Sequence, residues 1–263
     1  MNRLFKVLLF LGFLWVLSFG IASLMTSDNS IKVSRDTIAV IPIEGVITLN
    51  GGSSFLSSSL SAIDTVNKIK DANSNENVKG IVLEINSPGG TVMGSKKIAD
   101  ALKEVEKPTV AVISEYGTSG AYWAASQADL IVADELSIVG SIGVIGSYLD
   151  FSGFLDDHNV TYQRLVTGTY KDISSPYKEL TEEESDLIQE RLEGIHDYFV
   201  KDVAEGRAME ISEVEALAEG LFYLGMNSVD IGLVDELGDR EDAIAFAEEL
   251  AGISDGTISE YIE

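Results

Sequence analysis

The chain has 263 residues, 45% of them hydrophobic, which is enough for one large domain or two small ones. Its 43 acidic residues outnumber 18 basic ones, and the net charge of -25 argues against nucleic acid as a partner, because such a surface repels phosphate. No cysteine is present, which excludes a cysteine nucleophile, disulfides and thiolate metal sites.

The N-terminal stretch predicts a membrane anchor. Arg3 and Lys6 precede an uncharged run, Val7 to Met25, about as long as a helix that crosses a hydrocarbon core of ~30 Å. A cleaved signal peptide would have a shorter apolar core and an A-x-A-like end, and the flank argues against a buried core helix. The basic residues place the N-terminus in the cytoplasm. We therefore expect a single-pass protein of the cell membrane, with residues 1–25 as cytoplasmic end and anchor, 26–36 as a tether and 37–263 as an extracytoplasmic domain.

Strand and helix patterns alternate from Thr37 onward. Apolar, β-branched runs predict strands, and apolar residues three or four apart predict helices. In the first half of the chain we expect strands at 37–43, 78–85 and 109–113, a bent continuation of the first at 45–47, a Gly/Ser-rich loop at 51–59, and helices at 61–72 and 93–105.

The second half continues this alternation. Thr181 and Glu184 form a capping box at the start of a long helix. The last residues, 253–263, carry no clear signal and suit either a mobile tail or a regulatory segment in a neighbouring groove. The whole pattern predicts an α/β fold with a mostly parallel sheet and helices outside it. The further expected elements are strands at 129–133 and 161–166, a glycine-punctuated segment at 139–144, and helices at 149–157, 211–218 and 241–251.

The stretch from Thr109 to Ala125 carries the strongest functional signal. Its apolar run stops at Ser114, and a small-residue corner, Thr118-Ser119-Gly120-Ala121, precedes a helical pattern. A strand that breaks at glycine and restarts as a helix can present a serine at a sharp turn, beside the free N–H groups of the new helix. We therefore predict that Ser119 is a nucleophile.

A serine nucleophile needs a base, which is commonly histidine held by a carboxylate. The chain has two histidines, and both read as surface residues: His158 lies in a polar loop and His196 in a charged helix. The corner also departs from G-x-S-x-G, because Ala121 replaces the last glycine.

Lysine offers another route to a base. A free lysine has a pKa of ~10.4, and burial without a counter-ion can lower that pKa far enough for the amine to accept a proton near neutrality. Lys171 stands out because it follows a predicted strand and Gly168. A loop lysine paired with Asp172 is the plainer alternative.

A second serine-lysine pattern is set aside. Ser175 and Lys178 match the S-x-x-K of penicillin-binding enzymes, but no K-T-G follows, and the only S-D-N precedes them at the membrane edge.

An acyl-transfer site also needs donors for an oxyanion. Gly89 and Gly90 directly follow the strand at 78–85 and allow the backbone to approach a substrate closely. The amide that begins the helix after Ser119 can supply a second donor. An ordinary strand-to-helix turn would show the same glycines.

Four short motifs follow one another along the chain and, with the N-terminal anchor, resemble signal peptide peptidase A of the single-domain, membrane-anchored kind. Arg207 lies in a further segment like the family's, and the likeness covers roughly residues 37 to 240. The motifs are Ile85-Asn86-Ser87-Pro88-Gly89-Gly90, Thr118-Ser119-Gly120-Ala121-Tyr122, Gly140-Ser141-Ile142-Gly143-Val144 and Gly168-Thr169-Tyr170-Lys171-Asp172, followed by Gly232-Leu233-Val234-Asp235-Glu236-Leu237-Gly238.

The resemblance implies a ClpP/crotonase-like spiral of ββα units. It implies a serine endopeptidase that degrades signal peptides and other extended apolar peptides, without metal or cofactor. Ser119 would be the nucleophile and Lys171 the general base, oriented by Ser141. Relatives assemble as homo-oligomeric rings or domes, in which the serine and the lysine of one site come from neighbouring protomers.

The resemblance also assigns backbone roles. The N–H groups of Gly89 and Gly120 would form the oxyanion hole. The strand after Gly90, with Thr91 and Val92, would pair with an extended peptide.

The sequence departs from the family at Ala121, where relatives usually carry a second glycine, although alanine is small enough for the corner to survive. Two other functions stay open. A crotonase-type acyl-CoA enzyme would leave Lys171 without a role and would not explain the anchor. In a peptide-binding scaffold, Ser119 would be only a helix N-cap.

Overall fold

The computed structural model describes residues 36–53, 58–254 and 256–261. The predicted membrane anchor, Val7 to Met25, lies outside these ranges. Inside them, no helix combines the length and the apolar character that a bilayer crossing requires.

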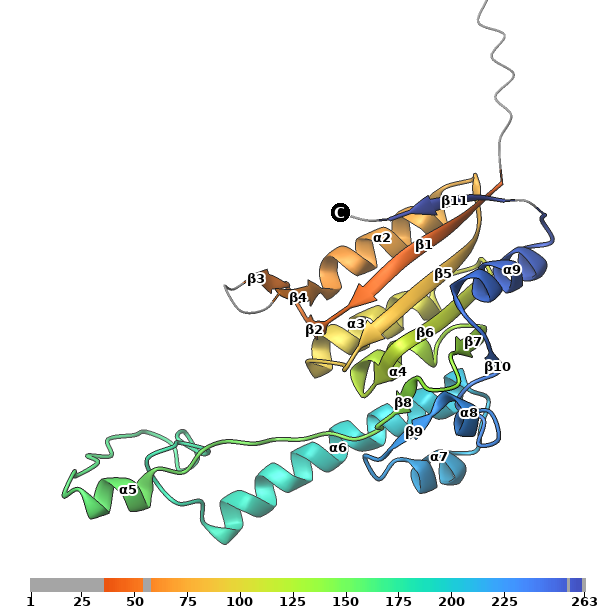
Figure 1. The fold of residues 1–263 in the computed structure, drawn as a ribbon. Helices are drawn as coiled ribbons and strands as arrows, with labels where there is room; N and C mark the ends of the chain where they lie inside the picture. Colours follow the sequence, from red (N-terminus) through yellow and green to blue (C-terminus); the bar gives the residue numbers. More distant parts are fainter. Residues whose placement is uncertain (1–35, 54–57, 255, 262–263) are drawn as a thin grey trace, which may run out of the picture. The chain divides into compact units, whose positions relative to one another are not determined.

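A parallel-rich sheet forms the centre of the fold (Figure 1). Within the described residues its path runs β10-β7-β6-β5-β1-β11 with parallel pairing throughout, while β8 joins beside β6 and pairs antiparallel with β9. This arrangement confirms the predicted α/β class. The strands are β1 (Thr37–Glu44), β5 (Val78–Ser87), β6 (Thr109–Thr118), β7 (Leu130–Ala133), β8 (Ile138–Gly140), β9 (Phe222–Leu224), β10 (Glu236–Leu237) and β11 (Thr257–Glu260).

Helices cover the sheet on both faces, which explains why its strands read as continuous apolar runs. Successive residues of β1 point to opposite faces: Ile38 and Val40 belong to the core cluster that contains residues of α9 (Arg240–Ala251), while Ile41 and Ile43 belong to the other cluster. That larger cluster takes residues from α2 (Ala62–Ser74), α3 (Val92–Lys103), α4 (Gly120–Ala125) and α6 (Glu182–Gly206).

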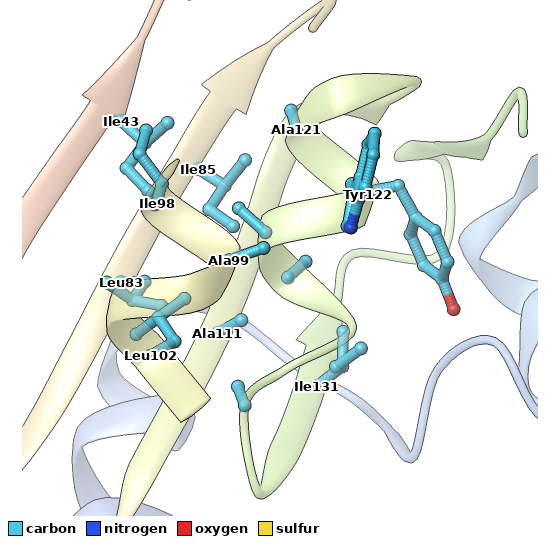
Figure 2. Packing of buried hydrophobic residues seen from close by; sticks show 14 of the residues in the cluster. Ile43, Leu83, Ile85, Ile98, Ala99, Leu102, Ala111, Ala121, Tyr122 and Ile131 are labelled. Atoms are coloured by element: carbon cyan, nitrogen blue, oxygen red, sulfur yellow. The ribbon is translucent and has the colours of Figure 1, made fainter. Parts of the chain in front are cut away.

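The packing of α3 on the sheet fixes the start of that helix near the serine corner (Figure 2). Ile98 and Leu102, one turn apart on α3, belong with Leu83 and Ile85 of β5 to one buried cluster. Burial of each such side chain stabilises the fold by about 1.5–3 kcal/mol relative to exposure. The predicted helices at 61–72 and 93–105 are confirmed with small shifts at their ends.

A second, three-stranded sheet lies in the segment between β1 and α2. It consists of β2 (Val46–Thr48), β4 (Ser58–Ser61) and β3 (Gly52–Ser53), in that order. The predicted loop at 51–59 therefore contains two short strands. Ile47 of β2 also forms an isolated parallel bridge with Gly90, so this small sheet fixes the turn after β5.

The region between β8 and α6 differs most from the prediction. Figure 1 shows this segment extending away from the sheet, with α5 (Ser152–Asp157) in it. The strand predicted at 161–166 is wrong: these residues are exposed, and they have no strand partner among the described residues. A strand forms only where a neighbouring strand can take its hydrogen bonds, and no described strand lies beside residues 161–166.

The remaining helices follow the sequence patterns closely. The capping box of Thr181 and Glu184 at the start of α6 is confirmed. Helices α7 (Ile211–Leu217) and α9 match the predictions, and α8 (Gly225–Ser228) is a further single turn. The terminal segment, which had no clear signal, forms β11 and pairs with β1 over Thr37–Val40.

Candidate active site

Ser119 lies at a strained corner between β6 and α4. β6 continues past Ile113 because Tyr116–Thr118 pair with β8, after Val110–Ile113 have paired with β7. Ser119 then adopts φ 51° and ψ -126°, a conformation that costs a non-glycine residue about 1–3 kcal/mol.

The backbone holds this corner and leaves the serine hydroxyl free. The Ser119 N–H donates to the Gly140 carbonyl over 2.7 Å, and the Ser119 carbonyl accepts from the Trp123 N–H over 3.0 Å. The side chain makes no capping bond to α4, and Oγ has no hydrogen-bond partner among the described residues. The structure therefore argues against Ser119 as a mere N-cap.

A cavity of about 580 Å³ lies at the corner. Its wall mixes apolar side chains with backbone amides and a few polar groups, as ligand cavities commonly do. The lining residues are Pro88, Gly90, Val92, Ser95, Ser119, Gly120, Trp123, Ser141, Gly143, Val144, Ile145, His196, Phe199, Ala218, Glu219 and Gly220.

Two glycines that line this cavity have backbone amides without an acceptor among the described residues. Among the described residues, neither the Gly90 N–H nor the Gly120 N–H donates a hydrogen bond, and both residues line the cavity. Gly89, the residue predicted for this role, is buried, and its N–H donates to Ser87 Oγ over 3.1 Å. The Ser87 hydroxyl therefore occupies the Gly89 N–H and leaves that of Gly90 available.

The strand expected after Gly90 is absent. Thr91 is the N-cap of α3, with Oγ1 accepting from the Gly94 N–H over 3.3 Å, and Val92 is the first helical residue. The Thr91 N–H also donates to the Ile47 carbonyl over 2.8 Å. Thr91 is a good helix cap, so the chain enters α3 at once and forms no strand there. Pairing of Gly90, Thr91 and Val92 with a peptide stays a prediction.

Ser141 lies in the same cavity as Ser119. Its backbone has φ 50°, and its N–H donates to the Leu221 carbonyl over 2.8 Å. Its Oγ donates to the Gly220 carbonyl over 3.2 Å. Ser141 is therefore placed beside the Ser119 corner. It directly follows Gly140, whose carbonyl accepts from the Ser119 N–H.

Lys171 does not line the cavity. It is exposed, and it belongs to the segment between α5 and α6 that Figure 1 shows away from the β6–α4 corner. Asp172 pairs with Arg164, whose guanidinium donates two hydrogen bonds of 2.6 and 2.8 Å, and not with Lys171. These bonds lower the pKa of Asp172. Tyr170 donates to Glu183 at the start of α6 and so braces the same turn from the other side.

Other candidate residues are engaged elsewhere. Lys178 Nζ lies 2.7 Å from both carboxylate oxygens of Glu184, which supports setting aside the S-x-x-K pattern. His158 stacks on Phe154 in α5. His196, by contrast, lines the cavity with a ring nitrogen 2.9 Å from the Ala218 carbonyl, so it is not a plain surface histidine.

Sequence reasoning missed the apolar wall of the cavity. Trp123 follows Ser119 by one helical turn, a spacing that could have placed it there. Phe199 of that wall and the polar residue Ser95 come from other helices, and no local pattern indicates them. Ala121 is fully buried, so the departure from glycine at this position is accommodated in the core.

Among the described residues, no group of three or more His, Asp or Glu side chains could hold a metal ion.

Arg207, at the end of α6, joins that helix to the segment before β10. Its guanidinium donates to both oxygens of Asp235 over 2.9 and 2.6 Å and to the Gly232 carbonyl over 3.1 Å. The Tyr122 hydroxyl donates to the neighbouring Leu233 carbonyl over 2.9 Å, and complete burial raises the pKa of this tyrosine. These contacts join the end of α6 to the Gly232–Gly238 run.

Among the described residues, the parallel-rich sheet presents Ser119 with an unpaired hydroxyl at a strained corner, beside two amides without an acceptor and a cavity. Serine-type hydrolases use such an arrangement. The family described as Peptidase family S49 matches residues 101–254, and the family described as Clp protease matches residues 53–134. The chain belongs to peptidase family S49.

The relatives agree with this family. A relative from Methanocaldococcus jannaschii, named as a protease, is 38% identical over 74% of this chain and 64% of its own length. One from Enterococcus faecium, named signal peptide peptidase SppA, is 35% identical over 87% of this chain and 67% of its own length. Protease 4 of Haemophilus influenzae is 32% identical over 81% of this chain but only 34% of its own length. The resemblance to signal peptide peptidase A is confirmed, although the chain spans only part of these relatives.

Proposed function

We propose that this chain is a membrane-anchored serine endopeptidase of the cell surface that cleaves extended apolar peptides, signal peptides among them. The observation that carries the proposal is the Ser119 hydroxyl at a strained corner, on a cavity that it shares with two glycine amides. Within the part of the chain that the structure describes, none of these three groups has a hydrogen-bond partner. The apolar wall of the cavity and the name of the Enterococcus faecium relative support the substrate class. The uncharged run Val7–Met25 supports the anchor and the extracytoplasmic location.

In the proposed reaction, Ser119 Oγ attacks the peptide carbonyl and forms an acyl-enzyme. The N–H groups of Gly90 and Gly120 donate to the oxyanion of the tetrahedral intermediate, and loss of one such donor typically costs about 2.7–4 kcal/mol of transition-state stabilisation. The amine of Lys171 takes the serine proton and passes it to the leaving amine. In the second step, Lys171 takes a proton from water, which attacks the acyl carbonyl. The proton returns to Ser119 Oγ as the acid product leaves.

Lys171 must come from a neighbouring copy of the chain in this proposal. It lies on a segment whose apolar side chains are unusually exposed, with Ile145 at 91%, Leu149 at 70% and Leu165 at 95%. Apolar surface of this extent is typical of an interface between subunits. Burial by the neighbour would also favour the neutral amine that a general base requires. Ser141 would then orient the incoming lysine beside Ser119.

A complementation experiment tests the dyad and the shared site together. Ser119→Ala and Lys171→Ala should each abolish hydrolysis of an apolar reporter peptide and leave the far-UV circular dichroism and the oligomer size unchanged. Co-expressed with different tags, the two inactive variants should regain activity, because mixed assemblies contain sites with both groups intact. Lys178→Ala is the matched control, since this lysine lies in the same segment but is paired with Glu184.

Two outcomes would contradict the proposal. Near-full turnover by either single variant would reject the Ser119–Lys171 dyad. A co-expressed mixture that assembles but stays inactive would reject a site shared between copies.

A further inference from the structure

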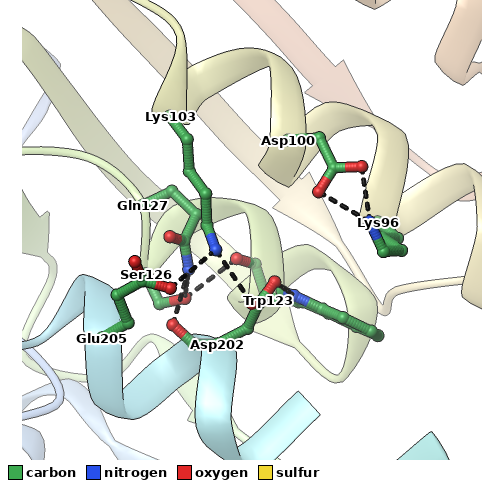
Figure 3. Close-up of polar contacts among 8 residues, drawn as sticks. All are labelled: Lys96, Asp100, Lys103, Trp123, Ser126, Gln127, Asp202 and Glu205. Atoms are coloured by element: carbon green, nitrogen blue, oxygen red, sulfur yellow. Dashed lines mark hydrogen bonds and ion pairs between the residues drawn. The ribbon is translucent and has the colours of Figure 1, made fainter. Parts of the chain in front are cut away.

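Trp123 forms part of the cavity wall beside Ser119, and its indole is held by a buried carboxylate (Figure 3). The indole is 2% exposed and stacks on Phe199 of α6, with ring centroids 4.5 Å apart and an interplanar angle of 13°. Its Nε1–H donates to Asp202 Oδ2 over 2.8 Å. The position of this wall is therefore set by α6 as well as by α4, the helix that carries it.

Asp202 connects three helices. Lys103 of α3 donates to Asp202 Oδ1 over 2.8 Å and to Glu205 over 3.1 Å. Burial works to lower the pKa of Lys103, but the hydrogen bonds to Asp202 and Glu205 outweigh it and raise the pKa above its ordinary value. Gln127, just after α4, donates to the Asp202 main-chain carbonyl over 3.0 Å. Both carboxylate oxygens of Asp202 are thus occupied, one by a cation and one by the indole.

A carboxylate at this position needs an explanation, because Asp202 is only 6% exposed. Removing a charge from water is costly even when a counter-ion is present, and apolar residues of similar size would join the helices without that cost. What the carboxylate adds is a short, directed, charge-assisted hydrogen bond to one N–H on the cavity wall.

We propose that Asp202 is a positioning residue that fixes the indole of Trp123 and thereby sets the shape of the cavity that receives a substrate side chain next to Ser119. This inference rests on the proposed peptidase function. Asp202 itself touches neither substrate nor the reacting atoms.

The Asp202→Asn variant tests the role of the negative charge on Asp202. An asparagine has nearly the same size but one acceptor oxygen, while Lys103 and Trp123 both donate. One of the two donors must then face the amide NH₂ group, which cannot accept its hydrogen bond. Either Trp123 or Lys103 therefore loses its acceptor. We expect discrimination between peptides with a large and a small apolar side chain at the cleavage site to fall by about tenfold, as loss of fit in an apolar pocket does.

Two measurements on the full chain test this. The chain has two tryptophans, so Trp15→Phe leaves Trp123 as the single indole. In that background Asp202→Asn should raise acrylamide quenching of Trp123 fluorescence, and it should reduce the ratio of kcat/KM values for the two peptides. Combined with Trp123→Phe, Asp202→Asn should change that ratio no further, because coupled residues are non-additive. Glu190→Gln is the matched control: it removes the ion pair with Arg191 on α6 (2.9 Å), in which both side chains are 67% exposed.

Each result decides the proposal. Unchanged quenching overturns it, as does increased quenching with an unchanged kcat/KM ratio, or a full additional effect of Asp202→Asn in the Trp123→Phe background. If Asp202→Asn does not fold, Asp202→Glu, which keeps the charge but moves it by one methylene, supplies the same comparison. If the parent chain cleaves no peptide, the proposed function fails, and the quenching comparison alone then decides whether Asp202 holds the indole.

Discussion

The hydroxyl of Ser95 lies directly against the backbone of Gly120. A Cβ atom added at position 120 would be 1.9 Å from Ser95 Oγ and 2.7 Å from Ser95 Cβ. Ser95 is 1% exposed, and its Oγ has no hydrogen-bond partner among the described residues. The first turn of α3 therefore requires glycine immediately after the nucleophile, and it holds the Gly120 amide where the proposed oxyanion would lie.

This contact predicts that a second substitution, at Ser95, restores the stability lost in Gly120→Ala. Gly120→Ala should destabilise the protein by about 1–3 kcal/mol, as overpacking does, and should abolish labelling of Ser119 by a fluorophosphonate. Adding Ser95→Gly removes both close contacts, and the next atom, the Gly90 nitrogen, is 3.4 Å away. The double variant should regain most of that stability in urea unfolding, less about 1 kcal/mol for glycine in a helix.

Gly194 provides the control for this pair. It also lies in a helix, α6, but a Cβ there would meet nothing within 4 Å. Gly194→Ala should raise stability by about 0.4–1 kcal/mol. A double variant no more stable than Gly120→Ala alone would show that the clash with Ser95 is not the cause.

Arg207 should contribute far more to stability than an exposed arginine. Its side chain is 7% exposed and bonded to both oxygens of Asp235, so Arg207→Ala leaves that carboxylate without its counter-ion. We expect a loss of about 3 kcal/mol in the free energy of unfolding, measured by urea titration. Arg191→Ala, at a pair with Glu190 in which both side chains are 67% exposed, should change it by less than about 0.5 kcal/mol. Equal effects of the two substitutions would refute this account.

The turn that carries Lys171 should loosen in acid. Arg164 lowers the pKa of Asp172 below its ordinary value of 3.8. Because this pKa is lower in the folded protein than in the unfolded chain, the contribution of the pair to stability is complete above about pH 3.8 and is lost as the pH falls through the folded value. An NMR titration of the Asp172 carboxyl carbon should give a midpoint below 3.8, and Arg164→Gln should move it upward.

Asp150 is the control for this titration. Its pKa is also lowered, by hydrogen bonds from Ser152, so Arg164→Gln should leave it unchanged. An Asp172 midpoint that does not respond to Arg164→Gln would mean that the pair does not brace the turn.

The sequence was sufficient to predict the features that depend on local chemistry. A strand ending in small residues before a helical pattern predicted the Ser119 corner, and Thr181 with Glu184 predicted the start of α6. It did not show which glycine amide is free, because that depends on the Ser87 side chain. The strand predicted at 161–166 is wrong because a strand needs a hydrogen-bonding partner, which these six residues alone do not reveal. No local pattern could show that Asp202 lies beside Trp123.

Pairing between β1 and β11 has a consequence for the order of folding. The two strands come from opposite ends of the described fold, and they pair in parallel at an edge of the sheet. β1 is synthesised before β11, so the outer backbone groups of Thr37–Val40 stay without this partner until the residues of β11 have been made. An open strand edge is a template for pairing with the wrong chain. Chains released before β11 is made would keep that edge open and exposed to pairing with other chains.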